Sequence, residues 1–323
     1  MNGGTVIVVA DEIVDPAAMA SELSERWAAA VRAEDGLPSG GGIVALLAGP
    51  GTDVSGAALD RLPDLRAIVV TSMGWDHVDV EAARARNVTV VGVDPYCVDE
   101  VAEHAVALVL DLLRGVTWLD ATVRAGNWDY GRVGRPVRGA VLGLVGLGRI
   151  GAAVAWRAAG LGMVVSAHDP VLGTASAAAT ASGTAATEPE VPSGLRLVPT
   201  LEDLVASSDV VSVHVPLGAG TRGLIDKNLL AHFREGSYLV NVSRGEVVTE
   251  PALGEALRQG RLAGAALDVL THEPPDRGDP VLAFPRTVLT PHAAWYSPAA
   301  IDRLSHSAGR ALARALADAG AVR

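Results

Sequence analysis

The feature that most constrains the fold is a glycine-rich turn between an apolar segment and an alanine-rich one. Residues 141–145 read Val-Leu-Gly-Leu-Val, and residues 152–161 have the composition of a helix. Between them lies Gly146-x-Gly148-x-x-Gly151. In such a strand–turn–helix unit the first glycine permits a tight turn, the second admits a pyrophosphate and the third lets helix and strand pack closely. The turn therefore predicts a Rossmann unit with a dinucleotide at the helix N-terminus. The expected contacts are Gly146, Gly148, Arg149, Ile150 and Gly151.

The next apolar segment begins at Val164 and ends at Asp169, where dinucleotide-binding proteins place an acidic residue. A carboxylate there accepts hydrogen bonds from the adenosine ribose and repels the 2′-phosphate of NADP. No Arg or Lys follows in residues 170–173. The sequence therefore predicts NAD as the cofactor, with Asp169 at the ribose.

Three polar side chains farther along suit the reduction of a 2-oxo acid. Arg244 lies in Asn-Val-Ser-Arg-Gly, Glu273 precedes Pro274, and His292 follows a Thr-Pro pair. A guanidinium grips a carboxylate with its planar fork. An imidazole protonates a carbonyl oxygen as hydride arrives, and a carboxylate keeps that imidazole charged and oriented. We expect Arg244, Glu273 and His292 to be catalytic.

Together these motifs resemble the NAD-dependent D-2-hydroxyacid dehydrogenase family, from about residue 70 to about residue 297. The segments that carry the resemblance are residues 168–170, 214–217, 241–245, 266–274 and 290–292. It implies that Arg244 binds the substrate carboxylate and carbonyl oxygen, that His292 is the acid/base, and that Glu273 pairs with His292.

The resemblance implies further contacts in both halves of the site. Asp268 would hold the nicotinamide carboxamide. Other cofactor contacts would come from Val215, Pro216, Val242, Ser243 and His292. Residues 71–76 look like the family loop whose backbone amides face the substrate carboxylate, so Met73, Gly74 and Trp75 would line the pocket.

Residues 291–297, Pro-His-Ala-Ala-Trp-Tyr-Ser, resemble the C-terminal-binding-protein branch of the family. In that branch the tryptophan matching Trp295 lines the substrate pocket. Its corepressor members bind NAD(H) and use a surface groove for short peptides, so an NAD(H)-sensing binding protein with little turnover is the alternative function. Formate oxidation on the same fold uses Gln as the partner of the histidine, and Glu273 argues against it.

Composition narrows the remaining possibilities. The chain has 323 residues, 49% of them hydrophobic, which is enough material for two cores. Its net charge of −11 opposes binding to nucleic acid or to an anionic membrane. Cys97 is the only cysteine, so no intrachain disulfide forms and a reducing compartment is expected. These features, without a recognisable leader or membrane span, predict a cytoplasmic enzyme of small 2-oxo or 2-hydroxy acids. No residues have metal-ligand spacing, and the resemblance implies a homodimer.

Short β-branched segments separated by helical ones predict parallel sheets covered on both faces. The expected fold class is α/β, with two doubly wound parallel-sheet domains: a Rossmann cofactor domain inserted in a flavodoxin-like substrate domain. The substrate domain would comprise residues 1–97 and 296–323, and the NAD-binding domain residues 98–295. Strands are expected at residues 6–10, 43–48, 67–71 and 88–91, near Val141, Val164, Val210, Tyr238 and Ala265, and at residues 288–290. Long helices are expected over residues 17–33 and 100–119.

Two other features are expected to lie outside the chemistry. Residues 173–194 are mostly Ala, Ser, Thr and Gly, a composition typical of a flexible surface loop, with a lid over the cofactor as the alternative. Among the remaining histidines, His104, His168 and His306 are expected to be packing or surface residues. His272 adjoins Glu273 and is expected to be solvated, with support of the catalytic pair as the alternative.

Overall fold

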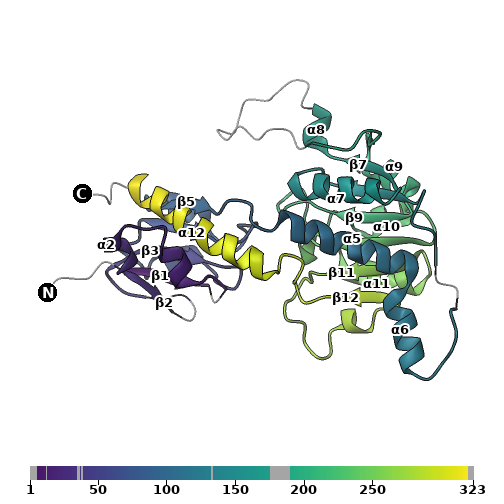
Figure 1. Cartoon of the computed structure of the whole chain (residues 1–323), viewed down its shortest axis with the longest axis horizontal. Helices are drawn as coiled ribbons and strands as arrows, with labels where there is room; N and C mark the ends of the chain where they lie inside the picture. Colours follow the sequence, from purple (N-terminus) through teal and green to yellow (C-terminus); the bar gives the residue numbers. More distant parts are fainter. Residues whose placement is uncertain are drawn as a thin grey trace. The chain divides into compact units, whose positions relative to one another are not determined.

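The structure is a computed structural model that describes residues 6–11, 13–34, 37, 39–131, 134–174 and 190–318. The chain divides into two compact units. The first comprises Met1–Cys97 with Tyr296–Arg323, and the second comprises Val98–Trp295. Each unit is built on one sheet with helices packed against it (Figure 1).

The first unit has a five-stranded parallel sheet in the order β2-β1-β3-β4-β5. The strands are β1 (Val6–Ala10), β2 (Val31–Ala33), β3 (Ile43–Ala48), β4 (Ala67–Val70) and β5 (Thr89–Gly92). This is the flavodoxin-like strand order. Strands β3 and β4 are buried along almost their whole length, as expected for a sheet covered on both faces.

Short helices connect these strands, and a long C-terminal helix covers part of the sheet. The helices are α1 (Pro16–Ala20), α2 (Glu25–Ala28), α3 (Gly56–Leu59), α4 (Val80–Ala85) and α12 (Pro298–Asp318). Helix α12 lies against β4, β5 and α1, and buries Leu304, Ala308 and Leu312 (Figure 1). Its start is capped by the Ser297 hydroxyl, which accepts the Ala300 N–H at 2.9 Å.

The single helix expected over residues 17–33 is wrong. Helix α1 ends at Ala20, α2 begins after Ser24, and residues 31–33 form the edge strand β2. In β2, Val31 pairs with Ile7 of β1. Pairing with β1 satisfies the backbone N–H and C=O groups of residues 31–33, and these hydrogen bonds outweigh the helical pattern of the segment.

The second unit has a seven-stranded parallel sheet in the order β12-β11-β10-β9-β6-β7-β8. The strands are β6 (Val141–Val145), β7 (Val164–His168), β8 (Arg196–Leu197), β9 (Val210–Val213), β10 (Ser237–Asn241), β11 (Leu262–Leu267) and β12 (Thr287–Leu289). The helices are α5 (Val98–Arg114), α6 (Val116–Arg124), α7 (Arg149–Gly160), α8 (Pro170–Thr174), α9 (Leu201–Ser207), α10 (Lys227–His232) and α11 (Glu250–Arg258), with 3-10 turns η1 (Gly245–Val247) and η2 (Pro280–Ala283). Two parallel-sheet α/β units confirm the predicted fold class.

The continuous helix expected over residues 100–119 is also wrong. Gly115 has φ +64°, a left-handed conformation that ends α5 and begins α6. Helices α5 and α7 lie side by side on the sheet (Figure 1). The short strand β8 was not expected, because its two exposed residues give no apolar pattern. Most of the stretch 173–194, including any lid, lies outside the described residues.

The strand order of the second unit fixes where a ligand binds. The chain places β7 and β8 on one side of β6, and β9 to β12 on the other. In open parallel sheets ligands bind beyond the carboxyl ends of the strands, at the point where the strand order reverses. Every strand of this sheet except β8 leads directly into a segment predicted to bind cofactor or substrate; the first residues of these segments are Gly146, Asp169, His214, Val242, Asp268 and Thr290.

Candidate active site

Of the three motif glycines in the turn after β6, only Gly148 has open space beside its Cα atom. Gly146 has φ +92°, and a Cβ atom there would lie 2.6 Å from the carbonyl oxygen of His214. A Cβ atom at Gly151 would lie 2.4 Å from the carbonyl oxygen of Gly146. At Gly148, by contrast, an added Cβ atom would meet nothing within 4 Å. Gly146 and Gly151 thus lie against other backbone atoms, whereas Gly148 faces open space. This arrangement fits a backbone that approaches a pyrophosphate.

Asp169 is tied to this turn by hydrogen bonds. Its Oδ2 atom accepts the N–H of Leu147 at 2.8 Å, and its Oδ1 atom accepts the N–H of Val171 at 2.9 Å. The carboxylate is therefore held beside the turn, at the end of β7. The Oδ1 atom also accepts the Leu172 N–H at 3.4 Å, whereas Oδ2 accepts one hydrogen bond within the described residues and so keeps capacity for a ribose hydroxyl.

Other residues expected at the cofactor surround the same turn. Arg149 and Ile150 form the first turn of α7. The Val215 side chain lies 2.9 Å from the position of a Cβ atom on Gly146, and Pro216 follows it on an exposed loop. Val242 and Ser243 follow β10. The structure thus brings these residues to the carboxyl edge of one sheet.

His214 was not singled out by the sequence, yet it lies directly beside the glycine turn. Its Nε2 atom is 2.9 Å from Ser212 Oγ, and its Nδ1 atom is shielded and without a hydrogen-bond partner among the described residues. Burial lowers the pKa of His214 from 6.5 to about 4. The ring is therefore neutral, and a shielded polar atom beside an open turn fits a site that a bound group completes.

The turn that presents Arg244 is held by Asn241, the last residue of β10. The buried Asn241 side chain accepts the N–H and the hydroxyl of Ser243, at 3.1 and 2.8 Å, and donates to the Arg244 carbonyl at 2.8 Å. The Nη1 atom of half-buried Arg244 donates to the Ser243 carbonyl at 2.9 Å. Asn241 is thus a positioning residue, which the sequence shows only through its place at the end of a strand.

Gly245 joins this turn to the loop that carries Glu273. A Cβ atom at Gly245 would lie 1.9 Å from the carbonyl carbon of Leu270 and 2.3 Å from the nitrogen of Thr271. Only a residue without a side chain permits this approach. The Thr271 N–H in turn donates to Glu250 at 2.6 Å. The segments of Arg244 and Glu273 are therefore packed backbone to backbone.

Glu273 and His292 form a hydrogen-bonded pair, with His292 Nδ1 2.7 Å from Glu273 Oε2. The other carboxylate oxygen, Oε1, accepts the Leu270 N–H at 2.7 Å. Burial alone would raise the pKa of Glu273, but the hydrogen bonds from His292 and Leu270 and the positive charges of His292 and Arg244 lower it overall. An ionised carboxylate on Nδ1 leaves the Nε2 atom of the imidazole for a substrate.

The backbone at His292 adopts a left-handed conformation, with φ +52°. The almost fully buried carboxylate of Asp268 holds this turn. It accepts the N–H groups of Ala293 and Ala294, both at 2.9 Å, and the Thr290 hydroxyl at 2.5 Å. The Asp268 main-chain carbonyl accepts the His292 N–H at 2.8 Å. Asp268 therefore fixes the backbone that presents the imidazole.

Trp295 also braces this turn, because its indole N–H donates to the His292 carbonyl at 2.8 Å. His272, expected as a possible support for Glu273, is exposed. Arg244, Glu273 and His292 thus come from three neighbouring strand ends of the second unit, to which Trp295 also belongs. The other predicted substrate contacts, Met73, Gly74 and Trp75, lie in the first unit.

Those contacts belong to the loop after β4. The Ser72 hydroxyl donates to the Gly74 carbonyl at 2.6 Å, which shapes the backbone around Met73. The Trp75 ring lies over Gly92, where a Cβ atom would be 2.7 Å from the ring. Gly92 therefore lets the indole lie on β5, with 40% of Trp75 exposed.

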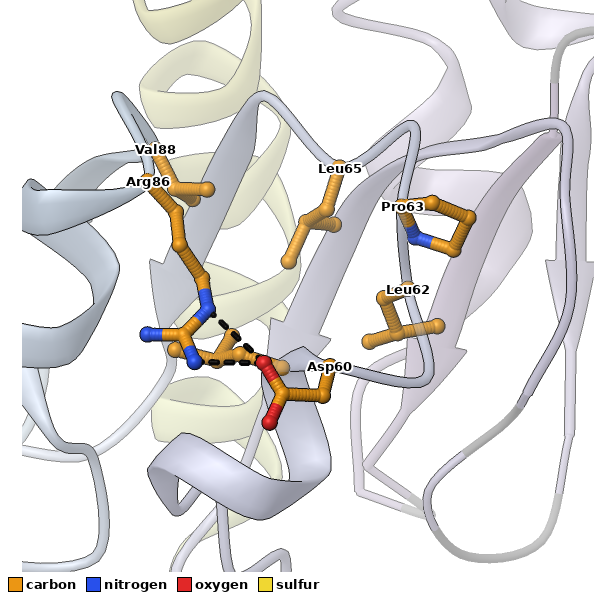
Figure 2. Close-up of a pocket in the computed structure, with 7 residues that line it drawn as sticks. Asp60, Leu62, Pro63, Leu65, Arg86 and Val88 are labelled. Carbon is orange, nitrogen blue, oxygen red and sulfur yellow. Dashed lines mark hydrogen bonds and ion pairs between the residues drawn. The ribbon is translucent and has the colours of Figure 1, made fainter.

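A surface pocket in the first unit does not belong to this constellation (Figure 2). Its lining residues include Leu65 and Val88, which precede β4 and β5 and so lie at the amino edge of the sheet. Its cation, Arg86, pairs with Asp60 at 2.5 Å and also donates to the carbonyls of Ala82 and Gly56. This guanidinium is engaged by the protein, and ligands of such sheets bind at the opposite edge.

Within residues 6–318, apart from the gaps stated above, no group of three His, Cys, Asp or Glu side chains is arranged to hold a metal ion. No helix in the described part of the chain is long and apolar enough to cross a membrane.

Comparison with known proteins agrees with this geometry. Residues 106–294 match the family model for the NAD binding domain of D-isomer specific 2-hydroxyacid dehydrogenase. D-3-phosphoglycerate dehydrogenase of Mycobacterium tuberculosis (strain ATCC 25618 / H37Rv) is 35% identical over 315 residues, which are 97% of this chain and 57% of that protein. The chain thus spans just over half the length of this relative.

Two solved structures are similar over nearly the whole chain. TT0316 protein from Thermus thermophilus is 32% identical with a TM-score of 0.79, covering 97% of both chains. A glyoxylate reductase from Paecilomyes thermophila is 25% identical with a TM-score of 0.81, covering 99% of this chain and 97% of the other. The chain belongs to the D-isomer specific 2-hydroxyacid dehydrogenase family, whose NAD-binding domain is matched by residues 106–294.

Proposed function

We propose that this protein is an NAD-dependent oxidoreductase that interconverts a 2-oxo acid and a D-2-hydroxy acid by hydride transfer. The observation that supports it most is the 2.7 Å pair of His292 and Glu273, which follow β12 and β11, with Arg244 after the adjacent strand β10. An acid/base, its ionised partner and a carboxylate-binding cation are the groups this reaction needs.

In the reductive direction, the side chains have different tasks. NADH supplies the hydride when bound. His292 donates the Nε2 proton to the substrate carbonyl oxygen, while its Nδ1–H stays hydrogen-bonded to Glu273. Arg244 binds the substrate carboxylate and stabilises the developing alkoxide with the same planar fork. In the oxidative direction His292 takes the proton back from the hydroxyl.

The cofactor would be held at the carboxyl edge of the second sheet. Gly146, Gly148 and Gly151, with Arg149 and Ile150, would bind the pyrophosphate, and Asp169 would accept the ribose hydroxyls. Val215, Pro216, Val242 and Ser243 would line the remaining length of the cofactor, with His292 at the nicotinamide end.

Asp268 would contact the nicotinamide carboxamide as well as the His292 turn. Its Oδ1 atom already accepts from Thr290 and Ala293, while the Ala294 N–H is the donor to Oδ2 within the described part of the chain. A carboxylate oxygen takes two hydrogen bonds, so Oδ2 retains capacity for an amide donor.

The first unit, residues 1–97 with 296–323, would bind the substrate, and residues 98–295 the cofactor. Met73, Gly74 and Trp75 of the first unit, and Trp295 of the second, are the proposed substrate contacts. The support is local: the Ser72–Gly74 hydrogen bond shapes the loop whose amides would face the carboxylate, and Trp75 is held on Gly92.

A homodimer is part of the proposal. Helix α6 and the segment after it expose several large apolar side chains: Val116, Trp118, Val123, Trp128 and Tyr130. Trp128 is 91% exposed and Tyr130 81% exposed. Apolar surface of this kind marks a protein–protein contact, and a second copy is the partner expected from the family. The buried Cys97 and the acidic composition suit a cytoplasmic location.

The alternative is an NAD(H)-sensing binding protein with little turnover. One experiment separates the two: a panel of glyoxylate, pyruvate, hydroxypyruvate and a phosphorylated 2-oxo acid, assayed by NADH consumption, with NADH affinity measured by fluorescence. Turnover that disappears in His292→Ala while NADH still binds supports the dehydrogenase. NADH binding without turnover of any acid would favour the sensor.

A further inference from the structure

His104, on α5, contacts the network that holds the His292 turn. Its Nε2 atom lies 3.1 Å from the Thr290 hydroxyl oxygen and 3.5 Å from Asp268 Oδ1. The ring is partly buried, with 26% of the side chain exposed. The sequence predicted His104 only as a packing or surface residue, because α5 and the turn at Thr290 lie far apart along the chain.

The chemistry of the groups determines which is the donor and which the acceptor in each of these hydrogen bonds. The Thr290 hydroxyl lies 2.5 Å from Asp268 Oδ1, and it donates its only proton there because an ionised carboxylate accepts and cannot donate. The same hydroxyl oxygen must then accept from His104. The Nε2 atom of His104 therefore carries a proton, and the donors point one way: His104 to Thr290, then Thr290 to Asp268.

The hydrogen bonds that run from His104 through Thr290 to Asp268 lead to the backbone around His292, the proposed acid/base. Asp268 accepts the N–H groups of Ala293 and Ala294, the two residues after His292. His292 itself has the left-handed φ of +52°, which a non-glycine residue keeps only when its surroundings enforce it. A carboxylate rotated away from these N–H groups would release that turn.

We propose that His104 is a positioning residue for the proposed reaction, acting on His292 through Thr290 and Asp268. This rests on the assignment of His292 as acid/base. By holding the Thr290 hydroxyl with its proton toward Asp268, His104 locks the carboxylate in the rotamer that accepts both N–H groups. The imidazole of His292 is then presented in one orientation, and misplacement of a reacting group by about 1 Å costs as much as about 100-fold in rate.

Two matched pairs of variants test the proposal. His104→Leu removes the donor, whereas His104→Gln keeps an N–H group on a side chain of similar reach. Thr290→Val removes the hydroxyl, whereas Thr290→Ser keeps it. With glyoxylate as the probe substrate, kcat should fall about tenfold in His104→Leu and in Thr290→Val, while the KM for NADH stays within about twofold. The two conservative variants should restore kcat to within about threefold of the unaltered enzyme.

The double variant His104→Leu/Thr290→Val shows whether the two side chains act through the same series of hydrogen bonds. Because loss of either breaks the same path, the double variant should be no slower than the slower single variant. Losses that multiply, or an undiminished kcat in His104→Leu, would overturn the proposal. Equal losses in His104→Gln and His104→Leu would also overturn it, since they would mean that only the ring shape matters.

A measurement without substrate keeps this proposal separable from the proposed function. Long-range ¹H–¹⁵N correlation spectra of the histidine rings report which nitrogen carries the proton, and the His104 signals are those lost in His104→Gln. A proton on Nε2 supports the chain of contacts, and a neutral ring protonated only on Nδ1 overturns it. If no 2-oxo acid is reduced, the dehydrogenase proposal fails, while the spectra still decide the contact between His104 and Thr290.

Discussion

Glu273 connects two strand ends with one carboxylate: Oε2 lies 2.7 Å from His292 Nδ1, and Oε1 accepts the Leu270 N–H at 2.7 Å. The backbone bond fixes the carboxylate on its own loop, so the imidazole is oriented against a fixed partner. The lowered pKa of Glu273 keeps this partner charged at neutral and mildly acidic pH.

Glu273→Gln should move the pH profile of 2-oxo acid reduction toward acid. An amide cannot stabilise the imidazolium by charge, so the variant has a competent acid over a narrower range of pH. The measurement is kcat/KM against pH for the unaltered enzyme and this variant, with Glu273→Asp as the charge-preserving control. Superimposable profiles for the glutamine variant would break the proposed coupling.

Arg244→Ala should remove turnover while NADH affinity changes little, because the guanidinium is assigned to substrate and the cofactor to the glycine turn and Asp169. Arg244→Lys should also be slow, since an ammonium cannot reproduce the two parallel hydrogen bonds of the fork. Steady-state kinetics and a fluorescence titration with NADH measure the two effects separately. A comparable loss of NADH affinity in the alanine variant would place Arg244 at the cofactor instead.

Asp169→Ala should weaken NADH binding and reduce discrimination against NADPH. The variant loses both the acceptors for the ribose hydroxyls and the repulsion of the 2′-phosphate. It also loses the bond from the Leu147 N–H, so Asp169→Asn, which keeps an acceptor there, is the matched control. The quantity to compare is the ratio of kcat/KM for the two cofactors, and a ratio that does not move in either variant contradicts the assignment.

Gly245→Ala should destabilise the fold by about 3 kcal/mol or more, because its methyl group would lie 1.9 Å from the Leu270 carbonyl carbon. Gly220 provides a matched control, since a Cβ atom there meets nothing within 4 Å. Gly220→Ala should change the free energy of unfolding by less than about 0.5 kcal/mol. Denaturant unfolding of both variants measures the difference. Equal stabilities would show that residues 270–271 move aside freely.

His214 should make the protein less stable as the pH falls below 6.5. Its pKa is about 4 in the folded chain and 6.5 as the ordinary value, so the unfolded chain binds the proton more readily between these limits. The stability is fully present above pH 6.5 and is lost toward pH 4, by about 3 kcal/mol at most. His214→Gln should lose this part of the pH dependence of unfolding, whereas a change at exposed His232 should not. An identical slope in the His214 variant would contradict a neutral buried ring.

The sequence predicted the sheet of the second unit well because its strands are largely buried and therefore read as short apolar runs. β6, β7 and β9 to β12 were all expected near their observed positions. It failed at Gly115, where a left-handed residue splits one expected helix, and at β2, where pairing with β1 outweighed a helical pattern. A local sequence pattern does not show the distant strand with which a segment such as β2 pairs.

The candidate site divides in the same way. Residues that would touch cofactor or substrate carry recognisable chemistry, so Gly146, Asp169, Arg244 and His292 are visible in the sequence. The positioning roles of the residues that hold them in place are seen only in the folded structure. Asn241 acts through hydrogen bonds inside a turn, and His104 reaches its partner across the fold. A hydrogen bond between distant segments leaves no periodic trace in either segment.

The left-handed backbone at residue 292 makes the most stable residue for this position different from the residue that the proposed chemistry needs. Glycine adopts such a φ without penalty, whereas histidine loses about 1 kcal/mol or more. Drift toward stability alone would therefore favour glycine at this position. The histidine therefore costs the fold stability that a glycine would not, and the proposed role of His292 in proton transfer would account for that cost.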